Sequence, residues 1–588
     1  MANLVTPGYQ RSVLINQILP HTEDRILDFR GINRKSVVAE GEMSDMWNLT
    51  AEKYPVLTPR RPRAEFDAPE GVKRPIHIVR RYGRVGLIAI DEDDNVSFYY
   101  NGQKIDQVDD LTTTSRVVAI NTKLCFFPQK TYLAMRETES GVEIGEYAPL
   151  EASLTVSSLE FELTLDSVTV TLPKGHGLGY DDAIDISGSM SFTPSGGSPI
   201  SMPCNVSCII EDVIEGDTED TIILPNETFI EATAAGASFV YVTGSIERTM
   251  PDLDMLVEWN NRLWGCSTAD NCIYASKLGD PKNWNYFQGT SMDSFYAEQG
   301  TDEDFTGIAE YSGHIIFFKP NSMCRVYGTS PSNYQITNTK CYGVEDGSRN
   351  SVLTINDRVF YKSSIGIMAY DGGIPYCVSE KLGRQFKNVV AGTEGQKYYA
   401  SCIEKDGRTW QGRLYVLDIE KALWHLEDDL RFTDTCKIDN SLYYTTVNAD
   451  ILVCDIDEYC EEDLMVGTEN IEGEAGIINP LKPTENYADY DWMATFGPFD
   501  EYIEEHKIYS KLALRFKANG PAQAKVYMAI DEQDWELIQE YPEISTQGEY
   551  IPIIPRRADR YSVKIEGTGD VEIKSLTRRV RRGTFGRL

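Results

Sequence analysis

The sequence is poor in histidine and lacks the short motifs that mark many enzyme sites. No two of its six histidines stand at the spacing of metal ligands: His21, His77, His176, His314, His425 and His506. It contains neither a Gly-x-Ser-x-Gly elbow nor a Gly-x-x-x-x-Gly-Lys phosphate loop. We therefore predict that the chain is not an enzyme, with no catalytic residue, no metal and no cofactor.

Long apolar runs are also missing. No stretch is apolar over enough residues to cross a membrane as a helix, so we expect no membrane span. Residues 1–20 lack the charged, apolar and small-residue sections of a signal peptide, so we expect the protein in the cytoplasm where it is made. The 12 cysteines form no paired Cys-x-x-Cys arrangement and are interpreted as reduced core residues. A disulfide between Cys266 and Cys272, which flank one turn, stays open.

Positive charge is scarce, because 56 Lys and Arg stand against 91 Asp and Glu and give a formal net charge of −35. This balance argues against general nucleic-acid binding, since phosphates need a positive surface. Basic residues gather near both ends, and an acidic body with basic ends indicates docking between subunits or onto an acidic partner. The candidate docking residues are Arg60, Arg61, Arg63, Arg578, Arg579, Arg581 and Arg582. For the C-terminal group, a solvated tail is the alternative.

The sequence does contain a repeated hairpin. Within 255–287, strands at 262–265 and 272–276 are joined by a polar turn. Similar units begin at Asn261, Ser312, Asn356, Lys397 and Asp439, in steps of 51, 44, 41 and 42 residues, and two more lie upstream at 84–90 and 122–127. A period of roughly 40–50 residues is typical of four-stranded propeller blades.

The fold class follows from this period and from an abundance of aromatic residues with almost no helical apolar spacing. We predict an all-β fold with a β-propeller of six to eight blades, seven favoured, an inserted small β-domain and a C-terminal β-sandwich. The alternative is a large irregular sandwich whose hairpins are evenly spaced. The predicted parts are an extended N-terminal arm (1–65), first blades (66–140), inserted β-domain (141–250), remaining blades (251–460), acidic linker (461–490), β-sandwich (491–577) and Arg-rich tail (578–588).

Two other features have both a structural and a functional interpretation. Carboxylates gather at Asp91-Glu92-Asp93-Asp94 and Asp302-Glu303-Asp304, where turns favour Asp, although some propeller glycosidases use carboxylate pairs. Four tryptophans have the chemistry to stack on sugar rings but more often pack between blades: Trp264, Trp284, Trp410 and Trp424. The structural interpretation is favoured for both features.

Several segments together resemble the tail hub or nozzle proteins of short-tailed bacteriophages, also called packaged-DNA stabilisation or tail tubular B proteins. They are Asn48-Leu-Thr-Ala-Glu-Lys-Tyr-Pro-Val-Leu-Thr-Pro-Arg60, Asn261-Arg-Leu-Trp-Gly265 with Ile273-Tyr-Ala-Ser-Lys-Leu-Gly-Asp-Pro-Lys-Asn-Trp284, and Arg556-Arg-Ala-Asp-Arg-Tyr-Ser-Val-Lys-Ile-Glu-Gly567. The segment from Lys174 to Gly188 is similar to small β-domains inserted in phage tail proteins. No single motif is diagnostic.

The resemblance implies a structural virion protein of the tail, assembled in the host bacterial cytoplasm. Copies would form a ring, with a hexamer favoured, next to the portal or adaptor and to tail fibre or tip proteins. The ring would extend the DNA channel, retain packaged DNA and let it exit at infection. Transient passage of double-stranded DNA requires a lining that does not bind phosphates, so the acidic turns 91–94 and 302–304 are candidate channel-lining residues. Competing hypotheses are a receptor- or glycan-binding propeller at a tail tip and a propeller glycoside hydrolase.

Overall fold

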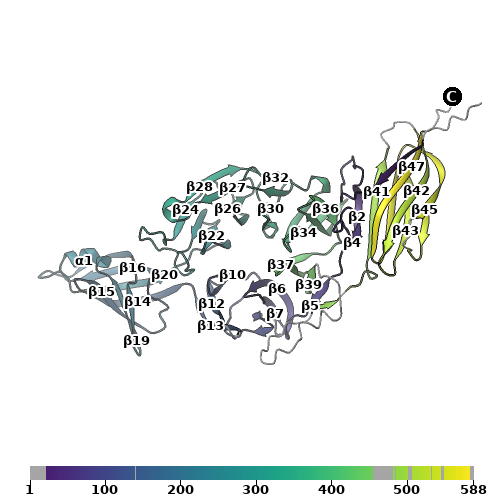
Figure 1. Cartoon of the computed structure of the whole chain (residues 1–588). Coiled ribbons are helices and arrows are strands. Elements are labelled where there is room, and N and C mark those ends of the chain that lie inside the picture. The colour runs from purple at the N-terminus through teal and green to yellow at the C-terminus, as the bar shows by residue number, and fades with distance from the viewer. Residues whose placement is uncertain are drawn as a thin grey trace, which may run out of the picture. The chain divides into compact units, whose positions relative to one another are not determined.

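The computed structural model describes residues 21–138, 141–454, 481–483, 485–500, 506–531, 533–544 and 549–582. The chain forms two compact units. Unit 1 comprises Met1–Arg60, Leu423–Glu427 and Glu485–Leu588, and unit 2 comprises Arg61–Ala422 and Asp428–Thr484. Both are built almost entirely from β-strands (Figure 1).

Unit 2 contains seven consecutive antiparallel sheets in its described residues, apart from an inserted sheet treated below. The first sheet holds β6 (Val72–Arg81), β7 (Arg84–Asp91), β8 (Val96–Tyr100) and β9 (Gln103–Lys104), and the second holds β10 (Arg116–Ile120), β11 (Lys123–Phe127), β12 (Thr131–Thr138) and β13 (Gly141–Pro149). The third sheet holds β21 (Met255–Trp259), β22 (Arg262–Ser267), β23 (Cys272–Ala275) and β24 (Phe295–Glu298). The fourth holds β25 (Gly307–Tyr311), β26 (His314–Lys319), β27 (Ser322–Tyr327) and β28 (Gln335–Lys340).

The last three sheets continue the series. The fifth holds β29 (Leu353–Ile355), β30 (Arg358–Ser363), β31 (Gly366–Tyr370) and β32 (Tyr376–Cys377). The sixth includes β33 (Phe386–Gly392), β34 (Lys397–Asp406) and β35 (Thr409–Asp418). The seventh holds β37 (Phe432–Ile438), β38 (Ser441–Thr446), β39 (Ile451–Cys454), β5 (Ala64–Phe66) and β40 (Leu481–Pro483). The short 3-10 helices η2 (Pro331–Asn333), η3 (Arg349–Ser351) and η4 (Glu380–Leu382) lie in loops.

The seven sheets close into a ring. Contacts link β6 to β10, β10 to β21, β21 to β25 and β25 to β29, while β33 contacts both η3 and β37, and β37 returns to β6. The N-terminal strand β5 pairs with β39, Ala64 lying opposite Val453, so the seventh sheet joins both ends of the repeat array. Ring closure gives each sheet a neighbouring sheet on both faces, and this radial repetition leaves only short strand edges. The prediction of an all-β propeller is confirmed, and the series contains seven sheets.

The repeat that is visible in the sequence is a two-residue turn between the first and second strands of a blade. In the turns at Asn260-Asn261 and Asn356-Asp357, both central residues have positive φ, from +47° to +58°. Asn and Asp tolerate this left-handed conformation, which matches the twist of a hairpin. The turn Asn101-Gly102, in contrast, joins β8 to β9 within the first blade.

A β-domain is inserted between the second and third blades. It contains β14 (Ala152–Leu163), β15 (Ser167–Pro173), β16 (Ala183–Phe192), β17 (Ile200–Ile209), β18 (Asp212–Glu215), β19 (Glu219–Pro225), η1 (Asn226–Phe229), α1 (Ile230–Ala234) and β20 (Phe239–Arg248). Its strand order is β17-β16-β20-β14-β15-β19-β18, around a core that includes Phe161, Leu224 and Val240. The predicted start at 141 is wrong, because residues 141–149 form β13 and pair with β12 of the second blade.

Unit 1 is a two-sheet β-sandwich. One sheet has the order β1 (His21–Ile26), β47 (Val571–Arg582), β42 (Lys507–Ala518) and β45 (Glu549–Ala558), and the other has β2 (Met43–Trp47), β41 (Asp491–Phe499), β46 (Tyr561–Thr568), β43 (Gln523–Ile530) and β44 (Glu536–Tyr541). The short strands β3 (Leu49–Thr50), β4 (Thr58–Pro59) and β36 (Leu423–Leu426) also fall in this unit.

Three predicted boundaries change in this part of the chain. The N-terminal segment is not simply an extended arm, because β1 and β2 are edge strands of the sandwich and residues 64–66 form β5. The predicted tail from 578 begins inside β47, which continues to Arg582. Of the predicted linker 461–490, residues 461–480 lie outside the described part, whereas 481–483 form β40. None of the described helices has the length and apolar character of a membrane crossing.

Candidate functional site

The candidate docking residues near the N-terminus are occupied within their own units. The guanidinium of Arg60, which is 4% exposed, donates to both carboxylate oxygens of Glu485 at 2.6 and 3.1 Å and lies 4.1 Å from the ring centre of Tyr490. Arg63 is 3% exposed and lies 2.5 Å from Asp428, and Arg61 is half-buried. Buried paired arginines hold this chain together and are not available to a partner, so the docking prediction is wrong for Arg60 and Arg63.

The C-terminal arginines whose side chains are described, Arg578 and Arg579, also pair with carboxylates of this chain. Arg578 is 4% exposed, lies 3.8 Å from the ring centre of Phe499 and 3.4 Å from Glu40, so the docking prediction is wrong for it as well. Arg579 is partly exposed and pairs with Glu23 at 3.2 Å. Arg581 and Arg582 end β47, and their side chains lie outside the described part of the structure.

The two acidic turns differ in their exposure. Asp91 is buried and accepts hydrogen bonds from Lys104, from Ser97 and from the backbone N–H groups of Asp93 and Asn95. The hydrogen bond from Lys104 is the largest of the effects that lower the pKa of Asp91 to about 2. Asp91 therefore shapes its turn and lines no channel. The exposed candidates are Glu92, Asp93, Asp94, Asp302 and Asp304, whereas Glu303 is half-buried and accepts from Asn321.

Three of the four candidate tryptophans are buried, and the fourth is exposed. Trp264, Trp284 and Trp424 are 5% exposed or less, which confirms packing for these three, and Trp410 is 44% exposed. No group of three or more His, Cys, Asp or Glu side chains in the described ranges is arranged to hold a metal ion. Cys266 and Cys272 are buried free thiols.

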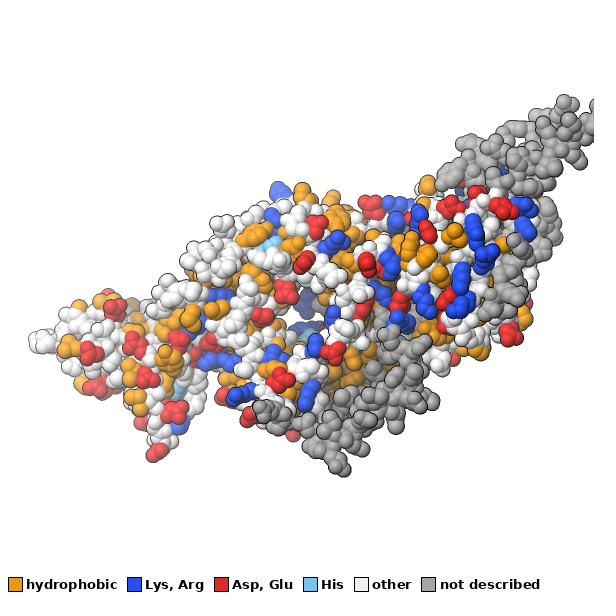
Figure 2. All heavy atoms as spheres, in the orientation of Figure 1, with side chains coloured by type: hydrophobic (Ala, Val, Ile, Leu, Met, Phe, Trp, Pro, Cys, Tyr) orange, Lys and Arg blue, Asp and Glu red, His pale blue; other side chains and the backbone are white. Residues whose placement is uncertain are grey.

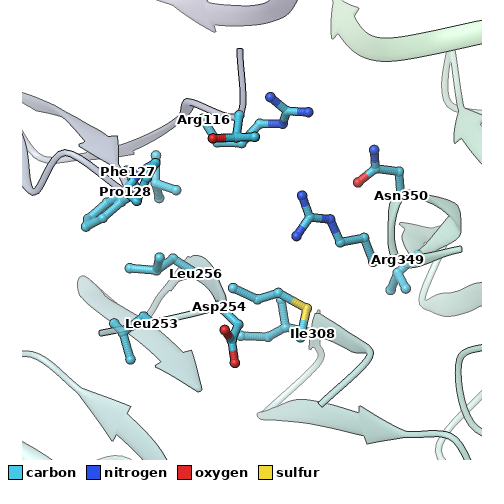
Figure 3. A pocket seen from close by; sticks show the side chains of 13 residues that line it. Arg116, Phe127, Pro128, Leu253, Asp254, Leu256, Ile308, Arg349 and Asn350 are labelled. Carbon is cyan, nitrogen blue, oxygen red and sulfur yellow. The ribbon is translucent and has the colours of Figure 1, made fainter. Parts of the chain in front are cut away.

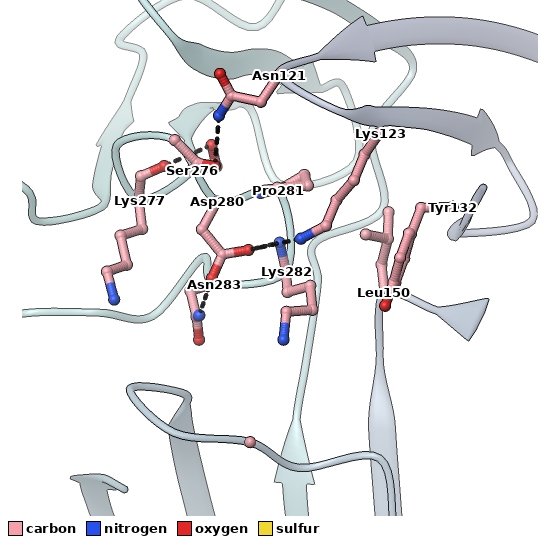
Figure 4. Close-up of polar contacts among 12 residues, drawn as sticks. Asn121, Lys123, Tyr132, Leu150, Ser276, Lys277, Asp280, Pro281, Lys282 and Asn283 are labelled. Carbon is pink, nitrogen blue, oxygen red and sulfur yellow. Dashed lines mark hydrogen bonds and ion pairs between the residues drawn. The ribbon is translucent and has the colours of Figure 1, made fainter. Parts of the chain in front are cut away.

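The loop 277–284, which carries the Gly-Asp-Pro-Lys-Asn-Trp part of the resemblance, forms many polar contacts (Figure 4). We call it the junction loop, because it lies between the second blade, the third blade and the inserted domain. Asn121, in the first turn of the second blade, donates to the Gly279 carbonyl at 2.9 Å. Trp284 packs against Ile120 and Leu150 and donates its indole N–H to Pro281 at 2.8 Å. These contacts lock the loop onto two blades.

The junction loop also holds the inserted domain. Asn283 accepts from the Ala183 backbone N–H at 2.8 Å and donates to Asp182 at 3.2 Å. Asp182 is 1% exposed, forms an ion pair with the buried Arg248 and lies 3.3 Å from Lys282. Lys277, 3% exposed, pairs with Asp181 and lies 3.8 Å from the ring centre of Tyr286.

The junction brings basic side chains against acidic ones, and two of its carboxylates, Asp182 and Asp280, each interact with two cations. Burial alone would raise the pKa of Asp280, but Lys282, Lys123 and hydrogen bonds from Lys282 and Asn283 outweigh it and hold that pKa below its usual value. Burial also raises the pKa of Tyr286 to about 12, helped by its hydrogen bond to Asp181. The junction is therefore a network of ion pairs and hydrogen bonds, which is the chemistry of a structural joint.

The second site is a cavity of about 430 Å³ inside the ring of blades, lined from β10, β21, β25 and η3. In Figure 2 the propeller is visibly hollowed at its centre. Arg116 and Arg349 extend into the cavity from different blades, with Asn350 beside them (Figure 3). Burial lowers the pKa of the Arg116 guanidinium and Arg349 lowers it further, whereas Asp434 raises it. Neither arginine forms an ion pair with a described residue.

Sequence reasoning missed this cavity. Arg116 and Arg349 are 233 positions apart, and nothing in either neighbourhood sets them apart from other blade arginines. The only available signal is position, because Arg116 opens a strand that is first in its blade. First strands face the axis of a propeller, so a charged residue there enters the interior.

No family model and no curated protein matches the chain. Among solved structures, it is similar to an exo-β-1,3-galactanase from Phanerochaete chrysosporium, at 9% identity over 55% of this chain and 94% of that one, with a TM-score of 0.21. It is also similar to BamB from Moraxella catarrhalis, at 11% identity over 53% and 98%, with a TM-score of 0.23. A third is the endosialidase of phage phi92, at 10% identity over 68% and 70%, with a TM-score of 0.24. These likenesses concern the fold alone.

The comparisons correct one prediction. The chain was predicted not to be an enzyme because it lacks familiar catalytic motifs, yet two of these three similar chains are an exo-β-1,3-galactanase and an endosialidase. Glycosidases place paired carboxylates in space and need no short sequence motif. The prediction that this chain is not an enzyme is therefore withdrawn.

Proposed function

We propose that this chain is a structural virion protein of a tailed bacteriophage, a tail hub or nozzle subunit. Copies form a ring, with six favoured, that extends the DNA channel, retains packaged DNA and lets it leave at infection. The ring adjoins the portal or adaptor and the fibre or tip proteins of the same tail. It assembles in the host cytoplasm.

The observation that carries the proposal is the role of the segments behind the family resemblance. In unit 2 the junction loop joins two blades and the inserted domain through Asn283 and Trp284. In unit 1 the segment 48–60 ends at Arg60, which binds Glu485 and also donates to Asn48 at 2.7 Å. A resemblance that falls on framework joints supports a shared architecture, whereas one confined to surface loops would not.

Charge gives independent support. A conduit for double-stranded DNA must not hold phosphates, and a net charge of −35 per copy opposes such binding. We propose that the exposed acidic residues Glu92, Asp93, Asp94, Asp302 and Asp304 line the DNA channel of the ring. Arg60, Arg63 and Arg578 are paired with carboxylates of the same chain, so they add no positive surface.

The test uses virus particles produced from the genome that encodes this chain. Mass spectrometry of purified particles should detect the protein at about six copies per tail, and electron cryomicroscopy should place its propeller around the DNA path. Its absence from purified particles, or a position remote from the channel, would overturn the proposal.

A further inference from the structure

We propose that the cavity inside the propeller binds a small organic anion, with Arg116 and Arg349 holding its oxyanion group and the apolar wall contacting its carbon body. The ligand class is a carboxylate or a phosphate monoester on a small apolar or ring-shaped body. This site is independent of the proposed tail function, because it lies within a single copy of unit 2.

The case for an anion rests on two cations that form no ion pair with a described residue. Arg116 donates from Nη1 to the Ser115 carbonyl at 2.7 Å, which leaves its other N–H groups for a ligand. Arg349 reaches the same cavity from η3, and no described carboxylate pairs with either guanidinium. Two like charges that face one space repel each other until an anion enters. The guanidinium fork matches the two oxygens of a carboxylate or phosphate.

Two carboxylates, Asp254 in the cavity lining and Asp434 within electrostatic range of Arg116, accept hydrogen bonds from other groups. The negative charge of Asp434 raises the pKa of Arg116. The Oδ2 atom of Asp434 accepts hydrogen bonds from His77 Nδ1 at 2.8 Å and from the Ile78 backbone N–H at 2.9 Å. Asp254 lines the cavity but accepts from the Thr268 backbone N–H at 2.6 Å. Neither of these hydrogen-bonded carboxylates forms an ion pair with Arg116 or Arg349.

The case for a small organic ligand rests on the walls and the size of the cavity. Phe127, Pro128, Leu253, Leu256 and Ile308 line it together with the arginines (Figure 3). A volume of about 430 Å³ falls within the range of small-molecule sites, roughly 300–1,000 Å³, which combine apolar walls with a few polar groups. Asn350 adds an amide that both donates and accepts hydrogen bonds.

Isothermal titration calorimetry on the full chain tests the site with four probes: phenyl phosphate, benzoate, benzyl alcohol and inorganic phosphate. We expect phenyl phosphate or benzoate to bind with 1:1 stoichiometry, at least about tenfold more tightly than benzyl alcohol and than inorganic phosphate. Tighter binding of benzoate would identify a carboxylate as the preferred group, and tighter binding of phenyl phosphate would identify a phosphate monoester. Equal binding of the neutral alcohol, or binding of inorganic phosphate as tight as that of the organic acids, would overturn the proposal, as would no binding of either acid.

Variants locate the binding. Arg116→Gln/Arg349→Gln should weaken binding of the preferred acid at least about tenfold, whereas Arg358→Gln, at an exposed arginine outside the cavity, should not change it. If the double variant does not fold, as judged by its thermal unfolding, Arg349→Gln alone replaces it, because Arg349 is exposed. Unchanged binding in a folded variant would overturn the assignment.

Discussion

Two groups of basic side chains in unit 2 behave in opposite ways. At the junction, Arg248, Lys277 and Lys282 each lie against a carboxylate. In the cavity, Arg116 and Arg349 have no such partner among the described residues. The difference shows that the neighbours a fold gives to a basic side chain, and not its residue type, decide whether the side chain stabilises the fold or can bind a ligand.

The physical reason is desolvation. Arg248 and Asp182 are 2% and 1% exposed, so neither charge is tolerated without the other. Arg349 is exposed and Arg116 half-buried, so water can solvate both until a ligand replaces it. The predictions below alter one side of this comparison at a time.

The largest expected effect is at the junction carboxylate. Asp182→Ala leaves Arg248 buried without its ion-pair partner and removes contacts to Lys282 and Asn283. Breaking such a pair should cost about 3–5 kcal/mol in the free energy of unfolding. Urea unfolding followed by tryptophan fluorescence measures it. Asp252→Ala, which removes a 90% exposed carboxylate paired with Lys130, is the control and should cost less than about 1 kcal/mol.

A smaller effect is expected from the backbone of the junction loop. Gly279 has φ +75°, and an added Cβ would lie 3.3 Å from the Asn261 amide nitrogen and 3.4 Å from that of Asn121. Gly279→Ala should cost about 1–2 kcal/mol from the left-handed conformation, plus the displacement of those amides. Gly83→Ala is the matched control, because Gly83 has φ +69° with open space around it. Equal losses for both variants would show that the junction contacts contribute nothing.

The smallest effect concerns Asp91, a buried acid paired with the partly exposed Lys104. Its pKa of about 2 lies below the ordinary 3.8, so the stability it contributes is complete above 3.8 and is lost as the pH falls to about 2. Wild type should therefore exceed Asp91→Asn in stability at pH 5 to 7, and the gap should close between about pH 4 and 2. Thermal unfolding across this range measures the gap. A gap that is constant with pH would contradict the assignment, and Asp93→Asn, at an exposed position of the same turn, is the control.

Much of the architecture was predictable because its signals are local. Turn residues such as Asn261 and Asn356 adopt left-handed conformations that set the spacing of the hairpins. The closing strand β5 was missed because Ala64-Glu65-Phe66 is too short to show alternation, and its partner Val453 is almost 400 positions away. The burial of Arg60 and Arg578 was missed for the same reason, since their partners Glu485 and Glu40 are distant in sequence. The cavity is likewise assembled from blades that no single segment describes.

One pair of matched substitutions tests the comparison most directly. The unfolding free energies of Arg248→Gln and Arg349→Gln are measured against wild type under the same conditions. The account predicts a loss of about 3–5 kcal/mol for Arg248→Gln and a change within about 0.5 kcal/mol for Arg349→Gln. Equal losses, or a greater loss at Arg349, would contradict the distinction between a junction whose charges are paired and a cavity whose charges await a ligand.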